Sequence, residues 1–116
     1  MGNYILWNDE DVLRLNNSYM RDFYEAISSI IKKNKIDNSA INMFLEKIDI
    51  DTRGFVCYEL TKHFDDKKDL CLLMSIVKEL LEKLKKENNW HPMGIEIVEN
   101  FYIFLSQKTI ENKLID

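Results

Sequence analysis

The sequence predicts an all-α fold, a compact bundle of about five helices that forms a single helical domain over residues 1–116. The chain contains only three glycines and one proline, fewer than the tight turns of a β-rich chain need. Apolar side chains recur at three- and four-residue spacing along most of its length, which is typical of amphipathic helices. Hydrophobic residues make up 46% and charged residues 31%, a balance that argues against both intrinsic disorder and a membrane protein.

The N-terminal third predicts a short extended arm followed by a long helix. Residues 1–6 form the arm, and Asn8 or Asp9 caps a helix that runs to about Lys33, with a break near residues 16–18 as an alternative. Glu10 and Asp11 favour the positive end of that helix. Its apolar stripe consists of Val12, Leu15, Tyr19, Phe23, Ile27, Ile30 and Ile31.

The middle of the chain predicts a short helix, a turn and an ambiguous segment. Asp37, Asn38 or Ser39 caps the second helix, and its core face consists of Ile41, Phe44, Leu45 and Ile48. A turn follows around Gly54. Residues 55–64 are predicted to be helical, but the β-forming residues at their start leave a strand open as an alternative.

Two further helices complete the prediction. Asp65 and Asp66 open the fourth, whose apolar stripe contains Leu70, Leu73, Val77, Leu80 and Leu84. This stripe spans only about two heptads, so packing within the chain is favoured over a dimer zipper. Pro92 suits the first turn of a final helix. Because that helix is apolar around most of its circumference, we expect it to lie centrally, to pack against the first and fourth helices and to contribute most to the core.

Charge and cysteine usage narrow the function classes. The net charge of −4 argues against nucleic-acid binding, which depends on clustered Lys and Arg, and suits a basic partner instead. Cys57 and Cys71 have apolar neighbours and are predicted to be reduced core residues of a cytoplasmic protein. The N-terminus has no secretory signal, and no uncharged run is long enough to cross a bilayer.

No catalytic, cofactor-binding or metal-binding residue is predicted. Residues 49–54 resemble the start of an EF-hand calcium loop, with aspartates at ligand positions one and three and a glycine at position six. However, Arg53 stands at ligand position five, and Leu60 stands at position twelve, where a bidentate glutamate is required. His63 and His91 occur in no metal-binding or nucleophile spacing. The sequence therefore predicts a binding protein rather than an enzyme.

Candidate partner-binding residues are carboxylates and tryptophans that cluster along the chain. Carboxylates can form charge-assisted hydrogen bonds to a basic surface, and tryptophan is common at interface hot spots. As an alternative to partner binding, the acids serve only to cap helices and keep the protein soluble. The alternative role of Trp90 is to cover the end of the core. The candidates are Trp7, Asp9, Glu10, Asp11, Asp49, Asp51, Asp65, Asp66 and Trp90.

These acidic and aromatic segments, together with the size and predicted helicity of the chain, resemble the small immunity proteins of bacterial toxin systems, such as contact-dependent inhibition and other polymorphic toxins. The resemblance is one of profile across the whole chain, not of motif. It implies a stoichiometric inhibitor, without a cofactor, that binds a toxin domain, often a nuclease, and occludes its active site. The alternative is a small helical adaptor or regulatory protein of phage or mobile-element origin, which homodimerises or uses an apolar groove.

Overall fold

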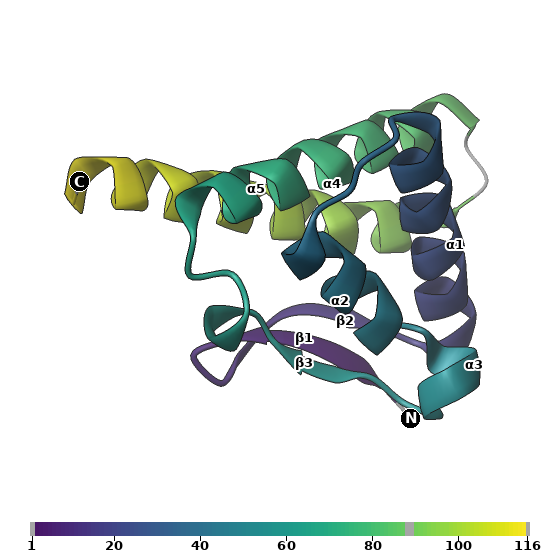
Figure 1. The fold of residues 1–116 in the computed structure, drawn as a ribbon. Helices are drawn as coiled ribbons and strands as arrows, with labels where there is room; N and C mark the ends of the chain where they lie inside the picture. The colour runs from purple at the N-terminus through teal and green to yellow at the C-terminus, as the bar shows by residue number, and fades with distance from the viewer. Residues whose placement is uncertain (1, 88–89, 116) are drawn as a thin grey trace.

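The computed structural model of this chain describes residues 2–87 and 90–115. It has a mixed α/β fold, in which a three-stranded sheet packs against helices (Figure 1). The predicted all-α helical bundle is therefore wrong. The elements in chain order are β1 (Asn3–Trp7), β2 (Glu10–Leu15), α1 (Asn17–Lys33), α2 (Ser39–Lys47), α3 (Ile50–Arg53), β3 (Cys57–Glu59), the 3₁₀ turn η1 (Leu60–Lys62), α4 (Lys67–Glu87) and α5 (Pro92–Ile115).

The correction is largest in the N-terminal third, where the predicted arm and the start of the predicted helix form an antiparallel hairpin. Asn8 and Asp9 connect the two strands with φ angles of 50° and 68°, the left-handed conformation that a two-residue type I′ turn requires. A register shift opposite Ile5 and Leu6 gives β2 an extra residue near Val12. This bulge makes the apolar spacing of the strand look helical in sequence.

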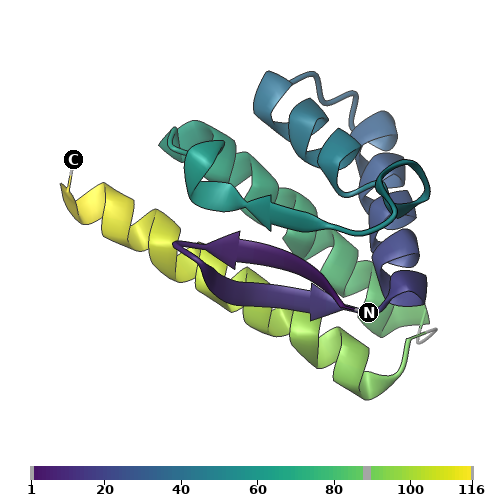
Figure 2. The same ribbon diagram turned by 90° about the horizontal axis from the view of Figure 1, so that it is seen from below.

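A third strand, from the middle of the chain, joins the hairpin to form the three-stranded sheet. Strand β3 pairs with β1 in parallel, so that Ile5 lies beside Tyr58, and the strand order is β2-β1-β3. The helical prediction for residues 55–64 is thus wrong, and the strand alternative is confirmed for residues 57–59. Figures 1 and 2 show the helices on one face of the sheet and, seen from below, the opposite face in front of them.

The predictions for the start of the second helix, the apolar stripe of the fourth and the start of the last are confirmed, whereas the start of the first helix predicted at Asn8 or Asp9 is wrong. Asn38 caps α2 by accepting a 2.9 Å hydrogen bond from the N–H of Ile41, and α5 begins at Pro92. Gly54 ends α3 with a φ of 83°, which a residue with a Cβ would adopt only with strain. All five apolar residues predicted for the fourth helix are buried on α4, so this stripe packs within the chain.

The core is one cluster to which sheet and helices both contribute. Helix α5 packs on α4, as predicted, but its second main partner is β2 rather than the first helix. It buries Val98, Phe101 and Leu105 but exposes Met93, Ile103 and Ile110. Among the residues whose burial the structure describes, which for α5 end at residue 110, α4 buries more apolar side chains than α5, and for this part of the chain the prediction that the last helix contributes most to the core is wrong.

Both cysteines lie outside the core that was predicted for them. Cys57 is exposed on the short strand β3, and Cys71 is half-buried on α4. Neither forms a disulfide. Within residues 2–87 and 90–115, no helix is both long and apolar enough to span a membrane.

Candidate protein-binding surface

The tip of the β1–β2 hairpin is held in place by the carboxylate of Glu59, which follows in the chain about fifty residues later. The N–H of Asn8 donates to Oε2 at 3.0 Å, and the N–H of Asp9 donates to Oε1 at 2.9 Å. The N–H and the hydroxyl of Thr61 also donate to Oε2. A single side chain therefore joins the left-handed turn, the end of β3 and the start of η1.

These hydrogen bonds keep Glu59 ionised. Partial desolvation raises the pKa of Glu59, but the hydrogen bonds from Thr61, Asp9 and Asn8 outweigh that effect and lower the pKa from 4.5 to about 2. The bonds favour the charged form because a carboxylate is a stronger acceptor than a carboxylic acid. Glu59 is therefore an anion whose oxygens are already occupied by donors of its own chain.

Three other carboxylates extend from the same hairpin, and two more lie just beyond η1. The side chains of Asp9, Glu10 and Asp11 are exposed, as are those of Asp65 and Asp66. Figures 1 and 2 both show the hairpin tip and the segment after η1 at the same end of the molecule. We call these five residues the acidic end. The structure thus places two of the three predicted acidic clusters at the same end of the molecule.

At this end of the molecule, Trp7 packs the hairpin against α5. Its ring meets that of Phe104 edge to face, with centroids 5.6 Å apart. The ammonium group of Lys108 lies 5.8 Å from the Trp7 ring centroid and 5.4 Å from that of Phe104, within cation–π range. Trp7 is half-buried, so its ring supports the acidic end and keeps part of its surface accessible beside it.

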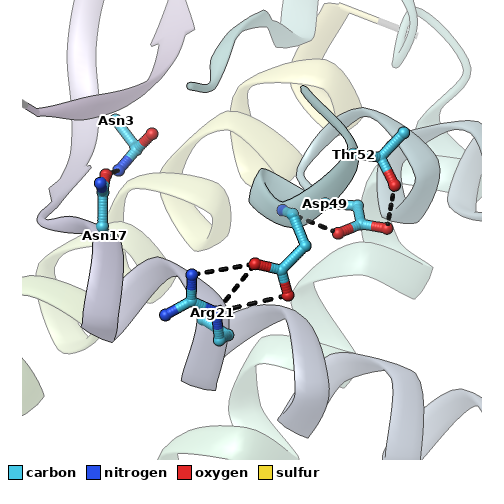
Figure 3. A network of polar contacts seen from close by, with 6 residues as sticks. Asn3, Asn17, Arg21, Asp49 and Thr52 are labelled. Atoms are coloured by element: carbon cyan, nitrogen blue, oxygen red, sulfur yellow. Dashed lines mark hydrogen bonds and ion pairs between the residues drawn. The ribbon is translucent and has the colours of Figure 1, made fainter. Parts of the chain in front are cut away.

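Asp49 and Asp51 lie at the opposite end of the molecule, beside α3 (Figures 1 and 2), and their carboxylates already have partners. Asp49 caps α3 by accepting from the N–H of Asp51 at 3.1 Å and from the hydroxyl of Thr52 at 2.9 Å. Asp51 pairs with Arg21 through two guanidinium nitrogens at 2.9 and 3.0 Å (Figure 3). Both carboxylates therefore tie α3 together and to α1.

Trp90 is mainly inside the molecule, with an exposed fraction of 7%. Its ring lies 4.7 Å from that of Tyr19 and packs closely against Gly94. The edge of Trp90 also lines a hollow of about 350 Å³ between α1 and α4, together with Asp22, Glu25 and other residues. The burial fits the alternative in which this tryptophan covers the end of the core.

Neither histidine is placed with candidate metal ligands. His63 stacks on Tyr58, and His91 accepts the N–H of Met93 at the start of α5. Among the residues that the structure describes, no group of three or more His, Cys, Asp or Glu side chains is arranged to hold a metal ion.

Glu59 is a residue of this candidate surface that the sequence interpretation missed. The sequence does contain a signal for the turn itself, because Asn8 and Asp9 are residue types that tolerate a left-handed conformation. No local pattern indicates that a glutamate so far along the chain completes the turn, since that contact depends on the parallel pairing of β1 and β3.

Comparison of the chain with protein-family models, with curated proteins and with solved structures gives no match in any of the three. The resemblance to toxin immunity proteins therefore stays a prediction.

Proposed function

We propose that this chain is an immunity protein that binds a basic toxin domain through the acidic end and thereby occludes the toxin's active site. The observation that carries the proposal is a rigid hairpin tip with exposed carboxylates. Asp9, Glu10 and Asp11 extend from a turn whose backbone is fixed by Glu59. A fixed turn loses little conformational entropy on binding, which raises affinity for a given set of contacts.

Charge supports a cationic partner. The five carboxylates of the acidic end attract lysine and arginine side chains over a distance of about 8–10 Å at physiological salt. Such a field accelerates encounter with a basic cleft and favours charge-assisted hydrogen bonds once contact is made. The half-buried ring of Trp7 adds an apolar contact at the edge of this surface, where tryptophan is a frequent interface anchor.

A growth experiment tests the function. The chain is expressed together with the C-terminal domain of the protein encoded by the reading frame immediately upstream of its own gene. We expect that domain to stop growth when it is expressed alone and the pair to grow normally. A neighbour that is harmless, or one that still kills in the presence of this chain, contradicts the proposal.

A kinetic experiment tests the surface with the purified toxin domain. We expect the triple change Asp9→Ala/Glu10→Ala/Asp11→Ala to weaken binding mainly through an association rate that is roughly tenfold lower at low salt, because exposed carboxylates steer the encounter. The matched control removes three exposed carboxylates elsewhere, Asp37, Glu82 and Glu96. Equal slowing in both variants would assign the effect to net charge and remove the acidic end from the binding site.

A further inference from the structure

A second concave surface lies where β2 ends and where α1 and α5 begin. These element ends lie at the end of the sheet opposite the hairpin tip (Figure 2). The groove has a volume of about 300 Å³, at the lower limit of the usual range for ligand pockets. Its lining residues are Arg14, Leu15, Asn16, Tyr19, His91, Met93, Gly94 and Ile97. It shares no residue with the acidic end.

The walls of the groove are mainly apolar. Leu15, Tyr19 and Ile97 contribute side chains from three different elements. Gly94 allows these elements to come close together, because a Cβ at this position would lie only 3.2 Å from the Trp90 ring and 3.4 Å from that of Tyr19. An aliphatic side chain bound in this groove would have its apolar surface removed from water on several sides, which favours binding.

Two polar side chains at the rim use their acceptors within the chain and keep donors available. The Oδ1 of Asn16 accepts the N–H of Tyr19 at 2.9 Å, which leaves the amide NH₂ as the unused part of that side chain. The Nδ1 of His91 accepts the N–H of Met93 at 3.1 Å. A neutral imidazole that accepts at Nδ1 carries its proton on Nε2, so His91 also presents a donor.

Arg14 supplies the positive charge at the rim. Its guanidinium lies 5.2 Å from the centroid of the Tyr4 ring, a cation–π contact that positions the group without neutralising it. In the described part of the chain, Arg21 and Arg53 form ion pairs with carboxylates, whereas Arg14 forms none. No aspartate or glutamate lines this groove, although Asp11 lines an adjoining hollow together with Arg14. The formal charge among the groove's own lining residues is that of Arg14, which is complementary to an anion.

We propose that this groove binds the C-terminal residue of a partner protein, with an aliphatic last side chain against Tyr19 and Ile97 and the terminal carboxylate at Arg14. A C-terminal residue carries both groups on one Cα, which matches a groove that brings an apolar wall and a guanidinium together in a small volume. Arg presents its donors in a planar fork that suits a carboxylate. The donors of Asn16 and His91 complete the polar rim.

The test uses the full chain, labelled with ¹⁵N, and three acetylated pentapeptides as probes. The first peptide is Gly-Gly-Ser-Gly-Leu with a free carboxylate, the second is the same peptide as the C-terminal amide, and the third ends in lysine with a free carboxylate. We expect saturable shifts of the amide signals of Asn16, Gly94 and Ile97 with the first peptide. The other two should bind about tenfold more weakly, since each lacks one of the two recognised groups.

Variants assign the contacts. Arg14→Gln should weaken the first peptide by about tenfold, whereas Arg53→Gln, with the same loss of charge on another surface, should leave it unchanged. Equal binding of the acid and the amide, or shifts that do not saturate, would overturn the proposal. Equal weakening by both arginine variants would also overturn it, and saturation by isovalerate as strong as by the peptide would assign the groove to small organic acids instead.

Discussion

The backbone N–H of Asp9 donates a 2.9 Å hydrogen bond to Oε1 of Glu59 across fifty residues of chain. The turn that carries this N–H has two consecutive left-handed residues, a conformation that costs free energy for residues other than glycine. Donors of such a turn point to one side and can together hold an anion. Glu59 is that anion, so the geometry of the acidic end depends on a residue outside it.

Replacement of Glu59 should loosen the hairpin without unfolding the core. We expect Glu59→Gln to lower the protection of the Asn8 and Asp9 amides against hydrogen exchange, because the neutral amide is a weaker acceptor than the carboxylate. Measurement by NMR at neutral pH tests this, with Glu82→Gln on the exposed face of α4 as the control. Unchanged protection in Glu59→Gln would show that the turn holds its shape without the anion.

The same contact predicts a pH dependence. The folded pKa of Glu59 is about 2, below its ordinary value of 4.5, so the carboxylate stabilises the folded hairpin above pH 4.5. This contribution is lost progressively as the pH falls from 4.5 towards 2. Protection factors of the Asn8 and Asp9 amides should decline over that window in the native chain and stay flat in Glu59→Gln. If protection declined equally in the native chain and in Glu59→Gln, the loss would have to be assigned to carboxylates other than Glu59.

Asn3 is predicted to be the polar residue on which stability depends most. It is fully buried, donates to the carbonyl of Leu15 at 3.1 Å and to Asn17 at 3.0 Å, and accepts from the N–H of Val56 at 2.9 Å. Asn3→Ala removes the side-chain acceptor of the buried N–H of Val56 and a side-chain donor to the carbonyl of Leu15, and we expect a loss of roughly 2–4 kcal/mol in the free energy of unfolding. Urea denaturation measures it.

The control for Asn3 is its exposed partner. Asn17→Ala removes only one of the hydrogen bonds, shown in Figure 3, and leaves the backbone groups of Leu15 and Val56 paired. Its effect should stay near or below about 1 kcal/mol. Equal losses in the two variants would mean that the contact between the two amides, rather than the backbone pairing, supplies the stability.

The sequence predicts the helices well where the signals are local. The cap at Asn38, the buried stripe of α4 and the start of α5 at Pro92 each depend on residues within a few positions of one another. The prediction fails for the N-terminal strands, and the reason is physical. The bulge in β2 breaks the alternation of apolar residues, so that the spacing from Val12 through Leu15 to Tyr19 continues into α1 as if one helix covered both.

The residues of the two proposed binding surfaces are predictable from the sequence only in part, for a similar reason. Asp9, Glu10 and Asp11 are recognisable as a cluster because they are adjacent in sequence. Their closeness to Asp65 and Asp66 follows from the parallel pairing of β1 with β3 and from the contact with η1, which no periodicity encodes. The groove at Arg14 is built from three separate segments and therefore has no signature in any one of them.

Trp90 should contribute to stability more than to binding. Its ring is packed against Tyr19 and Gly94, and truncation of such a residue to alanine typically costs about 3–5 kcal/mol. We expect Trp90→Ala to lower the urea midpoint strongly and Trp90→Phe to lower it by less, because phenylalanine fills part of the space. A Trp90→Ala protein that is as stable as the native chain would return this tryptophan to the list of partner-binding residues.

The hydroxyl of Tyr58 should make the protein less stable than a phenylalanine would. Tyr58 has an exposed fraction of 4%, and its Oη has no hydrogen-bond partner among the described residues. A buried hydroxyl without a partner costs free energy, so we expect Tyr58→Phe to raise the free energy of unfolding by about 1 kcal/mol.

Burial also raises the pKa of Tyr58 above its ordinary value of 10, so the native chain should lose stability as the pH rises above 10. Tyr58→Phe should lose less over that range, and the half-buried Tyr102 gives the control substitution. A Tyr58→Phe protein that is less stable than the native chain at neutral pH would mean that the hydroxyl is hydrogen-bonded in solution.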